Sequence, residues 1–325
     1  MKHHIVCSLI LFVAVQVMAQ QSKEIFLADP TIYQEGETYY LIGTKNRKPL
    51  GFSILESKDL KSWTVPAGQS DSLYMILNEG DNTFGTWGFW APQIIKEGST
   101  YYLTHTANEQ TVLTTSNSLM GPFRQEEVGP IDGSEKNIDS YIFKDDDGKY
   151  YLYHVRFNRG NYLWVAEFDL EAGEIKPETL TKCFDQTEDW EATPLYKSDP
   201  IMEGPTVIKL KDQYYLFYSA NHFMNIDYAM GYAIADSPYG PWVKNESNPI
   251  LHRSIVGENG SGHGDLFTGP NDQLHYVYHV HNSADQVSPR RTRIVPIIKK
   301  WNRKSKQFEF EVDEDQVIIP KQVTK

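Results

Sequence analysis

The sequence predicts an all-β fold, a five-bladed β-propeller with about four strands per blade. A polar residue, an apolar run, a tight turn and a second run rich in Tyr and Phe recur five times along the chain. Aromatic residues make up 13% of the 325 residues, which favours half-buried strands, and no long helical period interrupts the repeats. Each unit is too short to bury its own core. Neighbouring units are therefore expected to stack on one another.

The five units follow in order along the chain, each opening with a short motif. The opening motifs are Asp29-Pro30, Trp90-Ala91-Pro92, Asp139-Ser140, Glu203-Gly204-Pro205 and His263-Gly264. The second runs carry a tyrosine at matching places, namely Tyr40, Tyr102, Tyr151, Tyr215 and Tyr276. Later segments of three units close on an aromatic anchor, namely Trp63, Phe123 and Trp242. These recurrences indicate two hairpins, and hence four strands, in a unit.

The first 19 residues have the pattern of a signal peptide. Lys2 gives a basic start, residues 5–17 are mostly apolar, and Val17-Met18-Ala19 is a small-residue cleavage site. The apolar stretch is too short for a membrane span. We expect export to the periplasm or the extracellular space, with residues 20–325 forming a single propeller that is the catalytic domain.

The charge balance restricts the partners of the chain. It has 31 basic and 43 acidic residues, a net charge of −12. This balance argues against nucleic acid and against an anionic membrane surface. The expected partner is an oligosaccharide or polysaccharide substrate, and a monomer is expected.

In a propeller the first strand of each blade starts near the axis, so the opening residues converge. They are Asp29, Trp90, Asp139, Glu203 and His263. Inverting hydrolysis of a glycoside needs a carboxylate base and a protonated carboxyl roughly 6.5–9.5 Å apart. A third carboxylate beside the acid raises its pKa, and an indole gives a sugar ring an apolar face. Taken singly, an Asp before Pro is typical of a turn, His263 could bond the backbone and Trp90 could belong to the core. Because all five residues occupy the same place in their units, a shared functional site is favoured over these separate explanations.

These motifs resemble those of glycoside hydrolase family 43, over residues 27 to 301. The resemblance implies that Asp29 is the general base, Glu203 the general acid, and Asp139 the residue that tunes the pKa of the acid and orients it. It also implies that His263 lies on the axis, where it could hold a structural calcium through water. No cofactor is required for the chemistry. Arg290 matches a basic substrate contact, and Arg291 could take its place by a one-residue slip.

One residue departs from the family pattern. Ser140 follows Asp139 where members usually carry Pro, so the geometry of this carboxylate is open. His279 and His281 share a strand face, and a role in the core or toward substrate is favoured over zinc. Residues 45–51, 67–88 and 184–200 are expected to form the walls of the pocket. Phe89 and His222 are further candidate substrate contacts.

The resemblance makes α-L-arabinofuranosidase the first expectation, acting on terminal sugars of plant-type polysaccharide side chains. A β-xylosidase or an exo-galactosidase of the same fold is the alternative. A carbohydrate-binding propeller without catalysis is the alternative from another class, motivated by Ser140.

Overall fold

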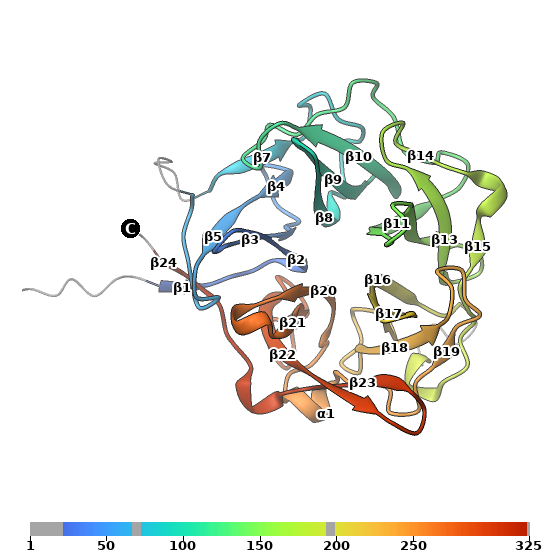
Figure 1. The fold of residues 1–325 in the computed structure, drawn as a ribbon. Coiled ribbons are helices and arrows are strands. Elements are labelled where there is room, and N and C mark those ends of the chain that lie inside the picture. Colours follow the sequence, from blue (N-terminus) through green and yellow to red (C-terminus); the bar gives the residue numbers. More distant parts are fainter. Residues whose placement is uncertain (1–21, 67–72, 193–198, 324–325) are drawn as a thin grey trace, which may run out of the picture.

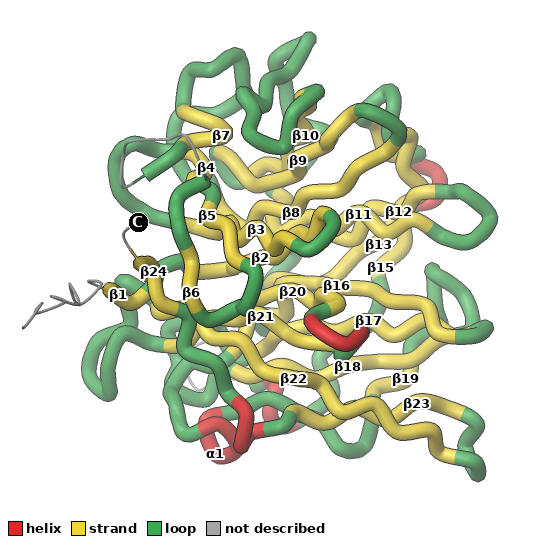
Figure 2. Tube along the Cα trace, turned by 60° about the vertical axis from the view of Figure 1, so that its left-hand side comes forward, coloured by secondary structure: helices red, strands yellow, loops and turns green. Residues whose placement is uncertain are grey.

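The computed structural model describes residues 22–66, 73–192 and 199–323. The predicted signal peptide lies outside the described residues. The structure confirms the all-β class. Helical segments in the described part of the chain are short: α1 (Arg253–Val256) and the 3₁₀ turns Pro177–Thr179, Asp189–Glu191, Pro270–Asp272 and Glu314–Gln316 (Figure 2). None of these described helices is long and apolar enough to cross a membrane.

Five antiparallel sheets follow the five sequence units. The first holds β2 (Ala28–Glu35), β3 (Thr38–Thr44) and β5 (Leu55–Ser57), and the second holds β8 (Trp90–Glu97), β9 (Thr100–Ala107) and β10 (Gln110–Ser116). The third holds β11 (Asn137–Lys144), β12 (Tyr150–Phe157), β13 (Asn161–Asp169), β14 (Glu174–Ile175) and β15 (Thr181–Lys182). The fourth holds β16 (Met202–Leu210), β17 (Gln213–Ala220), β18 (Ala229–Ala235) and β19 (Val243–Lys244). The fifth holds β20 (Gly262–Thr268), β21 (Leu274–Val280), β22 (Arg291–Asn302) and β23 (Gln307–Val312).

The first strands of these sheets surround a common centre. β2, β8, β11, β16 and β20 contact one another in this order, and β20 contacts β2 again (Figure 1). The later strands of each sheet lie progressively further from the centre. The start of every first strand therefore belongs to one central region.

The strand count differs from four in three sheets: the third has five strands, and the first two have three each. Their fourth strands are reduced to isolated bridges, Glu56 with Thr64 and Thr115 with Arg124. The adjacent anchors Trp63 and Phe123 are fully buried, so this part of the chain packs into the core instead of extending the sheet. The short strands β4 (Gly51–Ser53) and β7 (Met75–Asn78) pair separately.

The apolar core lies between neighbouring sheets, as the short repeats predict. One cluster joins the third and fourth sheets and includes Tyr153, Tyr218 and Trp242. Four further clusters fill the other gaps, and that between the first and fifth sheets includes Trp63 and Val277. Because each cluster takes side chains from two sheets, each sheet fixes the position of the next.

The two ends of the described chain meet on the first sheet. β24 (Lys321–Val323) pairs with β1 (Ser22–Glu24) on one edge and in parallel with β6 (Ser62–Trp63) on the other. This small sheet links residues from both ends to the end of the first unit.

Candidate active site

Each first strand carries a β-bulge near its start, in the same place. The register shifts after Ala28, Trp90, Ile138, Glu203 and Gly262. The next residue in each strand has a positive φ: Asp29, Ala91, Asp139, Gly204 and His263. The structurally equivalent residues thus differ from the predicted set at two positions. Trp90 and Glu203 stand one residue before the bulge residue of their strands, so the predicted register was wrong there.

The bulges surround a small axial cavity of about 30 Å³. It is lined by three consecutive residues from each first strand, residues 29–31, 91–93, 139–141, 204–206 and 263–265. The bulges thereby bring Asp29, Asp139 and His263 to one place. Trp90 and Glu203 lie outside this lining, nearer the mouth where the strands begin.

Asp29 is held by three basic side chains. Arg290 Nη1 donates to Asp29 Oδ1 at 3.0 Å, and the Nδ1 atoms of His279 and His263 lie 3.3 and 3.4 Å from the same oxygen. Burial opposes ionisation of Asp29, but Arg290, His263 and His279 outweigh it and hold the pKa of this carboxyl well below its usual value. Asp29 is therefore a carboxylate, the form that a general base requires.

His279 bridges Arg290 and the backbone of Asp29. Burial and Arg290 lower its pKa to about 3, so the ring is neutral. Arg290 Nη1 lies 3.1 Å from Nε2, and the backbone N–H of Asp29 donates to Nδ1 at 3.2 Å. His279 thus contacts both the backbone of Asp29 and, at 3.3 Å, its carboxylate. His279, which sequence reasoning left open between core and substrate, thus orients the candidate base.

Asp139 has the opposite electrostatic balance. Burial raises its pKa to about 7, Glu203 and Asp29 raise it too, and His263 lowers it. Its backbone N–H donates to Thr106 Oγ1 at 3.0 Å, while Oδ2 has no hydrogen-bond partner among the described residues. Asp29 and Asp139 therefore differ strongly in proton affinity although both face the axis.

Ser140, in the place of the usual proline, leaves the bulge intact. The φ of Asp139 is 54°, close to the 45° of Asp29, which does precede a proline. The Ser140 hydroxyl lies 2.5 Å from the hydroxyl of Thr104 on β9, so a hydrogen bond to the neighbouring sheet fixes the segment. The carboxylate of Asp139 is thus presented from the same backbone conformation as that of Asp29.

Glu203 receives a hydrogen bond from a residue outside the motifs. The Tyr228 hydroxyl donates to Glu203 Oε1 at 2.8 Å. The Tyr228 ring stacks on His279, with centroids 5.8 Å apart, and so connects the surroundings of Glu203 with those of Asp29. Sequence reasoning missed Tyr228 because it precedes β18 in a segment without a repeated motif.

His263 lies between the carboxylates. Burial disfavours its charged form, but Asp29, Asp139 and Glu203 outweigh burial and raise its pKa. Its Nδ1 is 4.0 Å from Asp139 Oδ2 as well as 3.4 Å from Asp29, and its backbone N–H donates to Ser219 Oγ. The ring packs on the backbone of Gly204, where an added Cβ would lie 2.6 Å from Cδ2. His263 therefore lies within ion-pair distance of both Asp29 and Asp139.

The axis does not offer a directly ligated calcium site. Ca²⁺ takes six to eight oxygen ligands. The carboxylate of Asp265, which also faces the cavity, already accepts hydrogen bonds from Thr31 and Thr206. The described residues contain no group of three or more His, Cys, Asp or Glu arranged to hold a metal. We therefore derive no step through calcium.

The remaining candidates divide between the mouth and the core. Trp90 is half-buried, packs edge-on against Trp87 and donates through Nε1 to Asn46 Oδ1 at 3.0 Å. His222 is partly buried and close enough to Glu203 and Arg290 to feel their charges, although burial dominates and lowers its pKa. The prediction that Phe89 contacts the substrate was wrong. Phe89 is 2% exposed, stacks on His105 and belongs to the core.

Arg290 and Arg291 have separate roles. Arg290 reaches Asp29, whereas Arg291 bonds Glu258 at 2.9 Å and the backbone oxygen of His281. Neighbouring residues of an extended chain point to opposite sides, so only one of the two can face the axis. The expected substrate contact for Arg291 is therefore corrected in favour of Arg290.

The comparisons with known proteins decide the family. The family model described as Glycosyl hydrolases family 43 matches residues 23–304. The chain belongs to this family. A crystal structure described as an endo-1,4-β-xylanase from Bacteroides thetaiotaomicron is 36% identical, with a TM-score of 0.84, and covers 94% of this chain and 100% of its own.

The curated relatives are more distant. A β-D-galactofuranosidase from Aspergillus niger is 27% identical over 249 residues, 70% of this chain and 65% of its own length. Xylosidase/arabinosidase 43B from Humicola insolens is 23% identical over 274 residues, 78% of this chain and 47% of its own length. The chain spans about half the length of several curated relatives that it matches.

Proposed function

We propose that the protein is an inverting glycoside hydrolase, with Asp29 as general base and Glu203 as general acid. The observation that carries the proposal is that the ionised Asp29, held by Arg290 and His279, and Glu203, held by Tyr228, lie at the starts of two first strands and are connected by the stacking of Tyr228 on His279. Family membership supports the same reaction. We further propose that the five sheets are the blades of a five-bladed propeller, in which residues 20–325 form the catalytic domain.

The mechanism follows from these two carboxyl groups. A water molecule attacks the anomeric carbon while Asp29 takes one of its protons. Glu203 gives its proton to the glycosidic oxygen as the bond to the leaving sugar breaks, and the configuration at the anomeric carbon inverts. Tyr228 fixes the position of Glu203. Asp139 is proposed to orient this acid, and its carboxylate lies 4.0 Å from His263 Nδ1. Trp90, Arg290 and His222 are proposed substrate contacts.

We propose that the substrate is a terminal sugar on a plant-type polysaccharide side chain. An α-L-arabinofuranoside remains the first candidate. A β-xyloside is the second, favoured by the names of the xylanase structure and of the xylosidase relatives, and a galactofuranoside the third. Export through residues 1–19 to the periplasm or beyond, a monomeric state, and a calcium ion held through water by His263 also remain proposals.

The test is proton NMR of the protein acting on nitrophenyl arabinofuranoside, xyloside, galactoside and glucoside. We expect one sugar to be released with inverted anomeric configuration. Retention of configuration would contradict the roles of Asp29 and Glu203. No turnover of nitrophenyl or natural oligosaccharides, together with measurable oligosaccharide binding, would favour the binding propeller.

The Glu203→Gln variant tests the acid directly. We expect kcat on an unactivated oligosaccharide to fall about a hundredfold or more, because the leaving oxygen then lacks a proton donor. The loss should be smaller on a dinitrophenyl glycoside, whose leaving group needs little protonation. The control is Glu309→Gln on β23, away from the mouth, which should behave as the parent. Equal losses on both substrates would contradict the assignment.

A further inference from the structure

A second cavity opens beside Asp29. It has a volume of about 300 Å³ and is lined by Phe26, Ala28, residues 44–47 and residues 288–290. Ala28 immediately precedes Asp29 and pairs with Thr44, the last residue of β3. Arg290 lines the cavity and also contacts Asp29, while Asn46, which lines it too, accepts the hydrogen bond from Trp90. The cavity therefore adjoins both the candidate base and the candidate sugar platform.

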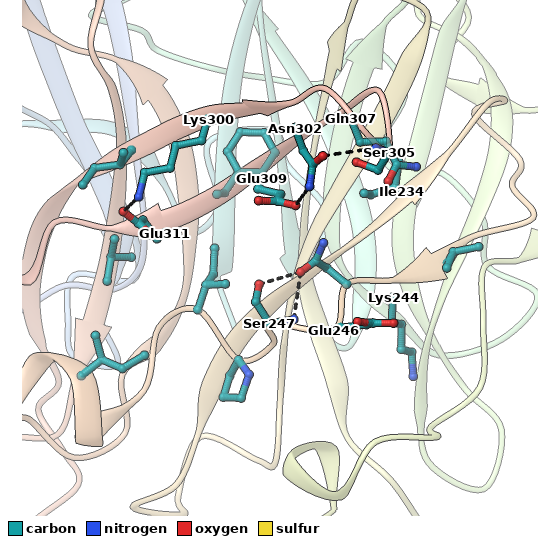
Figure 3. A pocket seen from close by; sticks show the side chains of 18 of the residues that line it. Ile234, Lys244, Glu246, Ser247, Lys300, Asn302, Ser305, Gln307, Glu309 and Glu311 are labelled. Carbon is teal, nitrogen blue, oxygen red and sulfur yellow. Dashed lines mark hydrogen bonds and ion pairs between the residues drawn. The ribbon is translucent and has the colours of Figure 1, made fainter.

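The lining of this cavity is cationic in an acidic protein. It contains Lys45, Arg47 and Arg290 but no carboxylate, although the chain has a net charge of −12. The larger cavity of about 970 Å³ between the fourth and fifth sheets differs in this respect (Figure 3). There, Lys300 pairs with Glu311, and Asn302 donates to Glu309. The single sign of charge is thus a feature of the cavity at the mouth.

Two of the three cations lack an acidic partner. The buried Lys45 ammonium donates to the Pro49 carbonyl, and Arg47 is exposed. Neither forms an ion pair with a carboxylate in the part of the chain that the structure describes. Burial and the charge of Arg47 lower the pKa of Lys45 to about 8. An anionic ligand would offset the repulsion between these cations.

The size and position of the cavity indicate which kind of anionic ligand it can bind. A cavity of this volume is at the small end of ligand sites and can hold a single sugar ring. Because the cavity adjoins Asp29, a sugar bound in it would be covalently linked to the sugar that is cleaved. Guanidinium groups bind carboxylates through paired hydrogen bonds.

We propose that this cavity is a subsite for a uronic acid, whose carboxylate is bound by Arg47 and Lys45. The inference rests on the proposed function, because it places the acidic sugar next to the bond that Asp29 and Glu203 cleave. The protein thereby selects acidic over neutral oligosaccharides.

Calorimetric binding to the Glu203→Gln variant tests the proposal without turnover. The probes are a glucuronic acid-substituted xylo-oligosaccharide and the neutral oligosaccharide of the same length. We expect the acidic probe to bind more tightly, and an added Arg47→Gln substitution to weaken it about tenfold while changing the Kd of the neutral probe less than twofold. High salt should weaken only the acidic probe.

The matched control is Lys48→Gln in the same loop. The Lys48 side chain is 81% exposed and pairs with Glu79 instead of lining the cavity, so its loss should leave both affinities unchanged. Equal affinity of the parent for the two probes, or equal effects of Arg47→Gln and Lys48→Gln, would overturn the proposal. Competition by inorganic phosphate as strong as that by free glucuronate would also overturn the proposal, since the cavity would then bind any anion without contacting the sugar ring specifically.

The outcomes separate this inference from the proposed function. Selective binding of the acidic probe by a protein that hydrolyses no glycoside would support the subsite and contradict only the catalytic proposal. Hydrolysis with inversion but without preference for the acidic probe would contradict only the subsite.

Discussion

At the scale of single residues, the pKa values of the two axial aspartates, Asp29 and Asp139, are shifted in opposite directions. Burial raises the pKa of Asp139 to about 7, so the folded protein keeps a proton on it that the unfolded chain loses near pH 4. The folded state therefore binds more protons across this range, and the contribution of Asp139 to stability falls as pH rises from about 4 to about 7. His263, with its raised pKa, acts with the same sign.

The Asp139→Asn variant should remove this dependence. Urea unfolding at pH 5 and pH 8 should show the variant gaining stability relative to the parent at the higher pH, on the order of 1 kcal/mol per unit of pKa shift. Asp132→Asn is the control of opposite sign. Burial raises the pKa of Asp132, but hydrogen bonds from Arg156 and Ser134 outweigh it and lower this pKa, so its contribution is lost as pH falls. A pH-independent difference between parent and Asp139→Asn would contradict the raised pKa.

The sequence could predict the carboxylates but not their surroundings. Asp29, Asp139 and Glu203 belong to repeated motifs, and a repeat carries its own register. Tyr228 and His279 reach the site from later strands or loops of their sheets, where no repeated motif marks them. Phe89 was misassigned because an aromatic residue before Trp90 looks the same in sequence whether it faces the mouth or the core.

At the scale of elements, the β-bulge at the start of each first strand organises the site. Its central residue needs a positive φ, which costs a residue with a Cβ roughly 1–2 kcal/mol. Four first strands accept this cost, at Asp29, Ala91, Asp139 and His263, and the fifth uses Gly204. The repeated Pro after the bulge residue, in Asp29-Pro30 and Gly204-Pro205, marks the true register. Aligning on this proline would have placed Ala91, not Trp90, in the set.

The Gly204→Ala variant tests the bulge of β16. Gly204 has a φ of 61°, and an added Cβ would lie 2.6 Å from the His263 ring. We expect a loss of about 1–3 kcal/mol from overpacking, in addition to the conformational cost, and a fall in kcat because His263 is displaced. The measurements are urea unfolding and kcat on the best nitrophenyl glycoside.

The Gly98→Ala variant separates the cost of overpacking from the conformational cost of a positive φ. Gly98 has a φ of 57° but nothing within 4 Å of its added Cβ, so this variant should show only the conformational cost, with activity unchanged. Equal destabilisation by the two substitutions would mean that the contact between Gly204 and His263 contributes nothing.

At the scale of the whole molecule, the sheets depend on one another. The clusters between sheets share their side chains, and the contact of β20 with β2 closes the ring. Repeats in the sequence predicted this stacking because no unit could bury its own core. They could not predict the closure by β24, since neither β24 nor its partner β1 carries a repeat.

Deleting β24 tests the contribution of this closure. Truncation after Ile319 removes the pairing of Lys321 with both Ser62 and Glu24, and the hydrogen bond from the Lys321 N–H to the Lys61 carbonyl. Each lost backbone hydrogen bond contributes about 1 kcal/mol, and 1 kcal/mol shifts Tm by roughly 2–4 °C in a domain of this order of size. We therefore expect Tm to fall by several degrees and hydrogen exchange to rise in β1 and β6. Truncation after Val323 is the control. Because β24 joins both ends to the first sheet, hydrogen exchange in the fourth sheet should stay as in the parent. A uniform rise of exchange in every sheet would contradict this expectation and show that the ring opens as a single cooperative unit.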